Sequence, residues 1–325
     1  MSFNPLFDRP QMLMERVIRN VEKVFVGKRE VIEKIVVACA AGGHVLLEDV
    51  PGVGKTMLIK ALARSIDSRF QRIQFTPDLL PSDLTGVSVY NRKSGEFEYK
   101  PGPLHANVIL ADELNRTSPR TQAAMLEAME ERCVTVDGHT YALPDPFMVL
   151  AAQNPLDCEG TYSLPEAQLD RFMMRLTVGY PDRSQEMLML DRMERSSPLD
   201  TLRPVLVREE WVALRKQVEQ VYVDPAIKRY IVELSDATRR SPDIAAGASP
   251  RASFALMRAG QAMALLDGRG YVIPDDIKQT VKDVYAHRLI LKHEVRLNGT
   301  TPEQLLEAIL GRLPIPGSAS RALAN

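Results

Sequence analysis

Apolar and polar positions along this chain follow two different patterns. In its first half, short apolar runs that suit buried strands alternate with stretches whose apolar residues share one helical face. The strand candidates are 45–47, 70–75, 108–111, 147–152 and 176–178, and helices are predicted at 10–24 and 57–63. The first half is therefore predicted to interleave strands with helices.

Two pairs of short alternating segments predict β-hairpins. The first pairs 87–90 with 97–99 around Ser94-Gly95. The second pairs 133–136 with 140–143 around Asp137-Gly138, a dipeptide that favours a type I′ turn. A surface hairpin without a role is the simpler alternative for each.

From about Pro181 onward no strand pattern of any length returns, and the apolar spacing is helical. Asp224-Pro225 and Ser249-Pro250 each place a capping side chain before a proline at the first helical position. We therefore expect an all-α second domain. The predicted organisation is a core at 1–180, a linker at 181–205, a helical lid at 206–313 and a flexible tail at 314–325.

Composition places the chain among ordinary globular proteins. It has 325 residues, enough for about two domains, with 45% hydrophobic and 26% charged residues. A net charge of −1 shows no basic excess, which disfavours nucleic acid as a partner. No signal peptide or membrane insertion is expected, and Cys39, Cys133 and Cys158 lack CxxC spacing, which suggests reduced thiols in the cytoplasm. Five histidines without close pairing make a structural metal unlikely.

The stretch from His44 to Arg64 has the strand–loop–helix order of a P-loop. Small residues such as Gly52 and Gly54 let backbone N–H groups surround a phosphate at a helix N-terminus. Lys55 would reach the β- and γ-phosphates, and the Thr56 hydroxyl would bind Mg²⁺. Asp49 stands where the strict pattern has its first glycine. The alternative is an ordinary glycine-rich turn before a helix.

The apolar run at 108–111 ends in Asp112 and Glu113, the Walker B pattern. Asp112 would hold Mg²⁺ and Glu113 would polarise the attacking water. Asn154, after the next strand candidate, is placed to orient that water. Arg171 stands beside apolar residues, and its alternative role is an ion pair with Asp170 or Glu166.

These motifs together resemble a known family. The stretches LEDVPGVGKT, ILADELNRTSPRTQAAMLEAMEER, AAQNP, LPEAQLDRFMM and GASPRA resemble the MoxR group of AAA+ ATPases, over about Val26 to Arg312. The resemblance implies an α/β fold: a P-loop NTPase αβα sandwich with a five-stranded parallel sheet, followed by an all-α lid. It also implies assembly into a ring, usually hexameric.

The resemblance also assigns roles to single residues. Asn154 becomes sensor 1, Arg171 the arginine finger and Arg251 sensor 2, and the two hairpins become pore-facing inserts. Glu113, Asn154, Arg171 and Lys55 are the expected catalytic residues. The expected ATP-binding residues are Val26, Gly27, Pro51, Gly52, Val53, Gly54, Lys55, Thr56, Met57 and Arg251, with Thr56 and Asp112 on Mg²⁺. Without the resemblance, Gly27 suits a plain helix–helix turn.

Relatives of this kind act as chaperone-like ATPases, often with partners that carry von Willebrand factor A domains. Two other classes remain open: a nucleotide-switched binding module with little turnover, and a DNA-translocating or chelatase-type ring motor. The complete set of Glu113, Asn154, Arg171 and Arg251 argues against a pure switch. The near-neutral charge argues weakly against a DNA motor.

Overall fold

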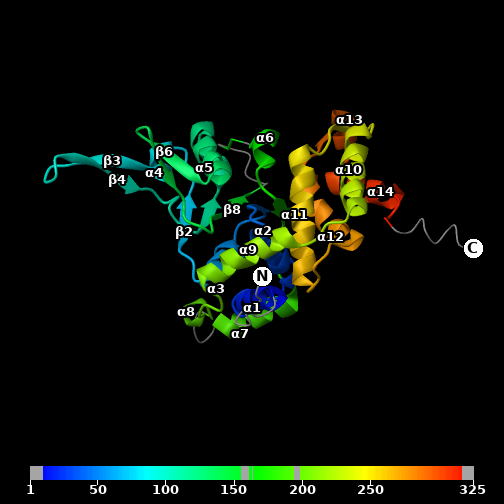
Figure 1. Cartoon of the computed structure of the whole chain (residues 1–325), viewed down its shortest axis with the longest axis horizontal. Helices are drawn as coiled ribbons and strands as arrows, with labels where there is room; N and C mark the ends of the chain where they lie inside the picture. The colour runs from blue at the N-terminus through cyan, green and yellow to red at the C-terminus, as the bar shows by residue number, and fades with distance from the viewer. Residues whose placement is uncertain (1–9, 155–160, 163, 194–197, 317–325) are drawn as a thin grey trace, which may run out of the picture.

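The structure is a computed structural model that describes residues 10–154, 161–162, 164–193 and 198–316. A layered α/β core that carries a long hairpin lies beside a group of helices formed by the C-terminal part of the chain (Figure 1). Cys158 and the predicted tail from residue 317 onward lie outside the described residues. Within the described ranges, no helix is both long enough and apolar enough to cross a membrane.

The core is built on a five-stranded parallel sheet in the order β2-β5-β8-β1-β9. The strands are β1 (Val45–Glu48), β2 (Phe70–Gln74), β5 (Val108–Asp112), β8 (Met148–Gln153) and β9 (Met174–Leu176). The last strand begins two residues before the predicted position. The three central strands are short apolar runs because both faces of a parallel sheet are covered. All five carboxyl ends meet at one edge, where ligands bind in sheets of this type.

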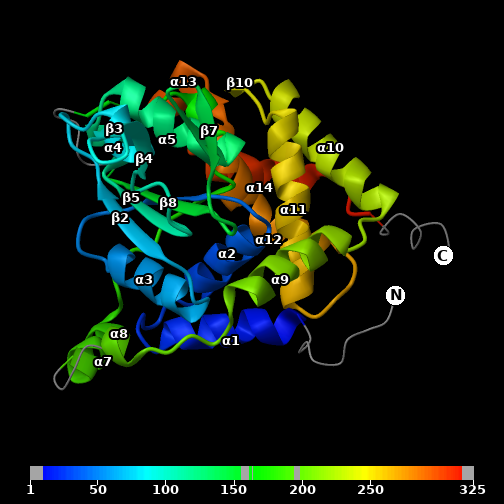
Figure 2. The same ribbon diagram turned by 60° about the vertical axis from the view of Figure 1, so that its left-hand side comes forward.

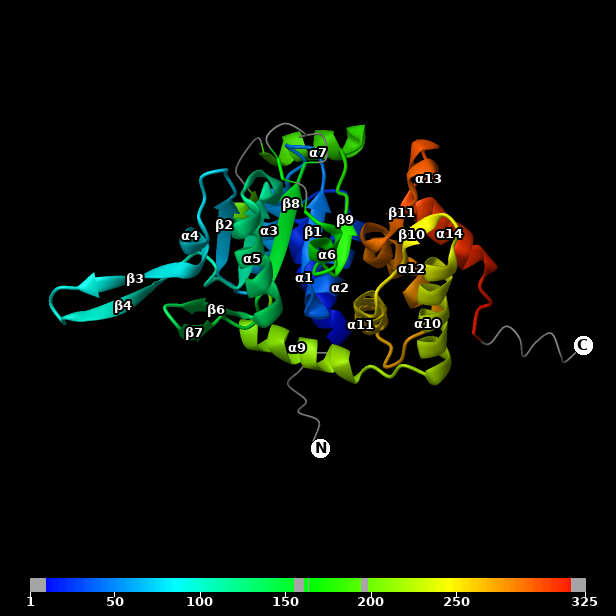
Figure 3. The same ribbon diagram turned by 90° about the horizontal axis from the view of Figure 1, so that it is seen from above.

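Helices cover both faces of this sheet (Figure 3). Alternate side chains of a strand point to opposite faces. Val45 and Leu47 accordingly belong to the apolar cluster of α1–α3, whereas Leu46 belongs to the cluster of α5. The core helices are α1 (Pro10–Glu22), α2 (Arg29–Ala40), α3 (Lys55–Ser65), α5 (Pro119–Glu131) and the short α6 (Glu166–Leu169). A 3₁₀ turn, η1 (Leu114–Arg116), follows β5.

Both predicted hairpins are confirmed. β3 (Gly86–Asn91) pairs with β4 (Glu96–Pro101) after the short helix α4 (Pro81–Thr85), and this hairpin extends away from the core (Figure 1). β6 (Cys133–Val136) pairs with β7 (His139–Ala142). Asp137 and Gly138 between them have φ values of +50° and +78°, as a type I′ turn requires.

The part of the chain that was predicted to form a lid is helical, with one addition. Its helices are α9 (Arg208–Gln220), α10 (Pro225–Arg240), α11 (Pro250–Leu266), α12 (Pro274–Tyr285), α13 (His293–Leu297) and α14 (Pro302–Arg312), with a 3₁₀ turn η2 (Ala286–Arg288). The side chains of Asp224 and Ser249 cap α10 and α11, as predicted. The addition is a small antiparallel pair, β10 (Ile244–Ala246) with β11 (Ile290–Leu291). Strands of three and two residues are too short for alternation to be recognised in a sequence.

Core and lid share one apolar cluster. Buried side chains of α9–α12 pack with those of α1–α3, and α11 contacts both α1 and α2 (Figure 2). The segment between the two parts contains α7 (Arg183–Met193) and α8 (Pro198–Thr201). Leu199 and Leu202 from this segment are buried in the same cluster. The lid therefore packs directly on the helices that cover the sheet.

Candidate active site

The P-loop connects β1 to α3 at the carboxyl edge of the sheet. Gly52 and Gly54 both have φ of +87°, a conformation that residues with a side chain rarely adopt. The loop forms one wall of a pocket of about 350 Å³. The pocket is lined by Pro51, Gly52, Gly54, Lys55, Thr56, Met57, Arg72, Asp112, Glu113, Ala152, Gln153 and Asn154. Segments that are far apart in the sequence thus form one site.

Lys55 is held at the base of this loop. Its Nζ donates hydrogen bonds to the backbone oxygens of Asp49 at 2.9 Å and Val50 at 3.3 Å. Burial lowers the pKa of Lys55, and the charges of Asp49, Asp112 and Glu113 oppose that shift. These carboxylates favour the charged ammonium group, which suits binding of phosphate oxygens.

Asp49, the departure from the strict P-loop pattern, has a structural role. Its side chain is buried, and Oδ2 accepts hydrogen bonds from the backbone N–H groups of Val178 at 2.6 Å and Gly179 at 2.7 Å. Oδ1 accepts another from Val50 at 2.9 Å. The carboxylate therefore ties the phosphate loop to the chain that leaves β9. A glycine at this position would leave those N–H donors without this acceptor.

The two carboxylates predicted as Walker B residues each have a partner on the neighbouring strand β2. Arg72 donates from Nη2 to Oδ2 of Asp112 at 2.6 Å, and from Nε to the same oxygen at 3.1 Å. Gln74 Nε2 donates to Oε2 of Glu113 at 2.6 Å. Arg116 also approaches Glu113, at 3.4 Å.

Sequence reasoning missed Arg72 and Gln74. The available signal was their spacing, since residues two apart in a strand share a face and only Ile73 between them is buried. Which strand they would adjoin could not be deduced, because β2 and β5 are neighbours only in the folded sheet.

The remaining residues that were predicted to bind ATP or orient water lie in three places. Asn154 and Met57 line the pocket, whereas Val53 is buried in the apolar cluster below it. Gly27 lies beside α7, where Gln185 Nε2 donates to its carbonyl oxygen at 2.9 Å. Val26 is buried next to it. Neither Val26 nor Gly27 lines this pocket.

Arg171 and Arg251 lie at the opposite edge of the sheet. Both contact Glu130 at the end of α5: Arg171 Nη1 is 3.1 Å from Oε2, and Arg251 Nη1 is 2.9 Å from Oε1. The residue two after Arg171, Met173, donates its N–H to His44 O at 2.8 Å, at the amino end of β1. The P-loop begins at the carboxyl end of β1. At a rise of 3.3 Å per residue, that end is about 13 Å from the amino end of the strand.

The alternative partner Asp170 is engaged elsewhere. Its Oδ1 accepts from Arg288 Nε at 2.6 Å and its Oδ2 from Ser249 Oγ at 3.1 Å. Arg171 forms an ion pair with Glu130, and Asp170 instead joins the core to the lid. The side chain of Glu166, the other alternative, lies outside what the structure describes.

The donor set of the pocket fits Mg²⁺. Thr56 and Asp112 offer a hydroxyl and a carboxylate, the hard oxygen ligands that this ion prefers. Among the described residues, no group of three or more His, Cys, Asp or Glu side chains could hold a metal alone. An ion here would take its other ligands from phosphates and water, as Mg²⁺ commonly does.

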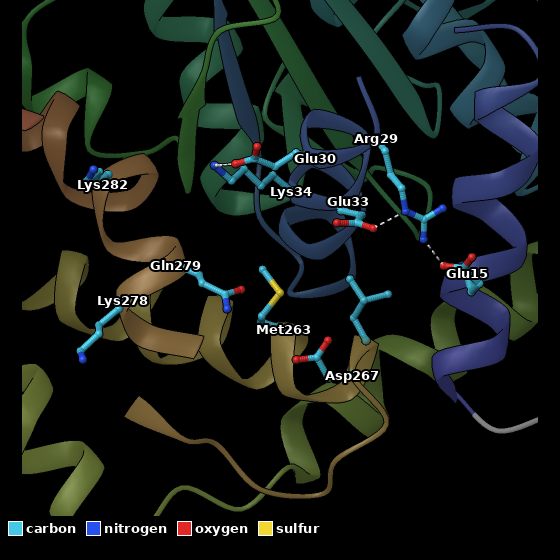
Figure 4. A pocket seen from close by; sticks show the side chains of 11 residues that line it. Glu15, Arg29, Glu30, Glu33, Lys34, Met263, Asp267, Lys278, Gln279 and Lys282 are labelled. Atoms are coloured by element: carbon cyan, nitrogen blue, oxygen red, sulfur yellow. Dashed lines mark hydrogen bonds and ion pairs between the residues drawn. The ribbon is translucent and has the colours of Figure 1, made fainter. Parts of the chain in front are cut away.

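A larger hollow, of about 530 Å³, lies at the junction of core and lid. Figure 4 shows Arg29 between Glu15 and Glu33, and Lys34 paired with Glu30. The charged side chains of α1 and α2 in this hollow are thus paired with one another, and the P-loop does not line it. The smaller pocket is therefore the candidate nucleotide site.

The parallel sheet, the P-loop and the acidic end of β5 define a nucleotide-binding ATPase domain with a helical lid. The model of the "ATPase family associated with various cellular activities (AAA)" matches residues 44–174, and that of the "AAA lid domain" matches residues 236–309. The chain belongs to the MoxR family of AAA+ ATPases.

Three similar proteins support this assignment. The chain is 39% identical over 312 residues to "Chaperone MoxR1" of Mycobacterium tuberculosis, covering 93% of this chain and 82% of that protein. It is 32% identical over 329 residues to "Protein MoxR" of Methylorubrum extorquens, covering 93% and 94%. It is 53% identical over 304 residues to "Uncharacterized protein YeaC" of Bacillus subtilis, covering 94% and 95%.

A solved structure agrees with the fold. The crystal structure of a candidate ATPase from Cytophaga hutchinsonii is similar with a TM-score of 0.89 and 41% identity. The similarity covers 94% of this chain and 96% of that one.

Proposed function

We propose that this chain hydrolyses ATP with Mg²⁺ and uses the energy to remodel or activate a protein partner. The observation that supports it most is the gathering of Lys55, Thr56, Asp112, Glu113 and Asn154 around one pocket. Lys55 would bind the β- and γ-phosphates, and Thr56 and Asp112 would hold the metal. Glu113 would polarise the attacking water, and Asn154 would orient it. Bound Mg²⁺ would neutralise charge on the phosphates.

We further propose that the active site is completed by a second copy of the chain, in a ring that is expected to be hexameric. Arg171 and Arg251 lie at the amino edge of the sheet, too far away to reach the P-loop of their own chain. Glu130 holds both guanidinium groups on this face. There they could meet the nucleotide of a neighbour, where an arginine finger contributes about 10³–10⁵ in rate.

The hairpins are the proposed contact with the partner. The β3–β4 hairpin exposes a set of apolar side chains, with Phe97 74% exposed. The set is Val87, Val89, Tyr90 and Phe97. Exposed apolar groups of this kind suit contact with the surface of another protein. A protein with a von Willebrand factor A domain is the partner class that the family resemblance suggests.

Two measurements test this function. The first is the ATPase rate of the wild type with and without DNA, with Lys55→Ala as a variant that should not bind ATP. Turnover that DNA leaves unchanged supports the proposal, whereas strong stimulation by DNA favours a translocating motor. ATP binding without turnover favours a nucleotide-controlled switch.

The second measurement uses Glu113→Gln, which should bind ATP but hydrolyse it slowly, because only the water-polarising group is lost. Affinity capture with this variant, with ATP and without it, should retain a protein in the ATP sample alone. Wild-type turnover by Glu113→Gln would contradict the Walker B assignment.

A further inference from the structure

Arg72 is a further cation in the phosphate pocket. It lies on the edge strand β2, its side chain is 49% exposed, and it lines the pocket together with Lys55 and Thr56. β2 runs parallel to β5, with Gln74 opposite Asp112. The side chains of Arg72 and Gln74 therefore both reach the end of β5.

The guanidinium group of Arg72 is held on two sides. Nη2 lies 2.6 Å from Oδ2 of Asp112 and 2.7 Å from Oε1 of Gln74, and Nε lies 3.1 Å from the same Asp112 oxygen. The carboxylate of Asp112 is only 18% exposed. Charge-assisted hydrogen bonds of this length, partly shielded from water, are stronger than neutral ones.

This arrangement conflicts with metal binding at Asp112. A divalent cation and a guanidinium group repel each other, and close approach of both to one carboxylate oxygen is unfavourable in a partly buried site. When Mg²⁺ approaches Asp112, directly or through water, Arg72 loses much of the attraction that holds it there. The phosphate oxygens of a nucleotide bound in this pocket would offer the guanidinium group other acceptors that match its planar geometry.

We propose that Arg72 competes with Mg²⁺ for Asp112 and thereby sets the metal dependence of nucleotide binding. In the nucleotide-free protein Arg72 occupies the carboxylate. When Mg²⁺-nucleotide binds, Arg72 turns from Asp112 to the phosphate oxygens. Arg72 is thus a positioning residue for the metal and a phosphate ligand in the bound state. This inference rests on the nucleotide site proposed above.

The competing explanation is that Arg72 only joins β2 to β5. A purely structural ion pair would change the stability of the sheet edge when removed, but it would not change how nucleotide affinity depends on Mg²⁺. The dependence on metal therefore separates the two explanations, and it can be measured without catalysis.

The experiment is calorimetric titration of ATP into the full chain, in EDTA and at a series of Mg²⁺ concentrations. Each titration is completed before much ATP is hydrolysed, or it uses protein that also carries Glu113→Gln. In Arg72→Gln, we expect the ratio of ATP affinity at saturating Mg²⁺ to affinity in EDTA to rise about tenfold. Half-saturation by Mg²⁺ should move to lower concentration. Removing the competitor strengthens metal binding. It also leaves the charge of Asp112 unneutralised, and we expect this charge to weaken binding of metal-free ATP more than the lost phosphate contact weakens binding of Mg²⁺-ATP.

Two control variants separate the position of the charge from its presence. Arg72→Lys keeps a cation at the same position and should stay within about threefold of the wild-type ratio. Arg69→Gln removes the same charge just before β2 begins, about 10 Å along the chain, and should leave the ratio unchanged. Thermal melts of the nucleotide-free variants show that each is folded, and Arg72→Met serves in place of Arg72→Gln should that variant not fold.

The outcomes are distinguishable. An unchanged ratio in folded Arg72→Gln or Arg72→Met, with ATP binding to the wild type intact, overturns the role of Arg72 and leaves the nucleotide site standing. An equal change in Arg69→Gln overturns it too, because the effect would then be one of general charge. Wild-type protein that binds no ATP at any Mg²⁺ concentration overturns the proposed function, and this inference with it.

Discussion

Tyr99 and Tyr141 stack on each other with ring centroids 3.9 Å apart and an angle of 15° between the planes. Tyr99 belongs to β4 of the first hairpin and Tyr141 to β7 of the second. One hairpin precedes the Walker B strand, and the other joins α5 to the strand that leads to Asn154. The stacked pair therefore joins two inserts that precede β5 and β8, the strands whose carboxyl ends lead to Asp112 and Asn154.

We predict that Tyr141→Ala loosens both hairpins, because the stacked pair contributes about 1 kcal/mol beyond the area it buries. Amide hydrogen exchange measured by mass spectrometry should become faster in β3–β4 as well as in β6–β7. Tyr141→Phe keeps the ring and should exchange like the wild type. Faster exchange confined to β6–β7 would show that the two hairpins move independently.

Sharing of the active site between copies can be tested by mixing variants. Arg171→Ala should bind ATP and assemble but hydrolyse slowly, because it lacks the proposed finger while its own P-loop is intact. Lys55→Ala should lack ATP binding but still supply Arg171 to a neighbour. Mixtures of the two inactive variants should recover part of the wild-type ATPase rate.

Mixed assembly must be verified with two different affinity tags. Glu130→Gln is a useful companion variant, since it removes the charge that holds Arg171 and Arg251 while keeping a side chain of similar size. Mixed oligomers that show no recovery would argue against a shared site.

The buried carboxylate of Asp49 should stabilise the protein. Asp49→Asn replaces a charged acceptor of three backbone N–H groups, and hydrogen bonds to charged groups contribute about 1.5–3 kcal/mol. We predict a decrease in the free energy of unfolding of about that size, measured with urea. Asp137→Asn makes the same chemical change at an exposed turn that asparagine also favours, and should have little effect. Equal stability of the two variants would contradict the structural role of Asp49.

Buried histidines should make the protein less stable in acid. Burial lowers the pKa of His44 from 6.5 to about 4, and its Nδ1 accepts a hydrogen bond from Val149 N at 3.0 Å. Burial also lowers the pKa of His287 well below its usual value. As the pH falls below 6.5, the unfolded chain binds protons that the folded chain does not, so stability is complete above that pH and decreases toward pH 4.

For His44 alone the loss should approach about 3 kcal/mol near pH 4. Urea unfolding at several pH values between 7.5 and 4.5 measures it. His44→Asn removes the titrating group but keeps an acceptor, so its stability should decline less steeply, with His287 accounting for part of what remains. A slope equal to that of the wild type would contradict the assignment to His44.

The sequence by itself determined the local parts of this protein. The P-loop, the acidic end of β5, the helix caps at Asp224 and Ser249 and the turn at Asp137-Gly138 each depend on consecutive residues. Their conformation and chemistry follow from backbone preferences and side-chain donors within a few positions. These features, and the candidate residues for phosphate and metal within them, could therefore be predicted from local patterns in the chain.

The tertiary structure alone decided which distant groups meet. Arg72 reaches Asp112 across 40 residues, Arg251 reaches Glu130 across 121, and Asp49 reaches Val178 across 129. Parallel strands need long crossover connections, so neighbouring strands in this sheet come from separate parts of the chain. Local sequence patterns therefore do not determine the order of the strands. The cation that occupies the candidate metal ligand, and the face that presents Arg171 and Arg251, both follow from that order.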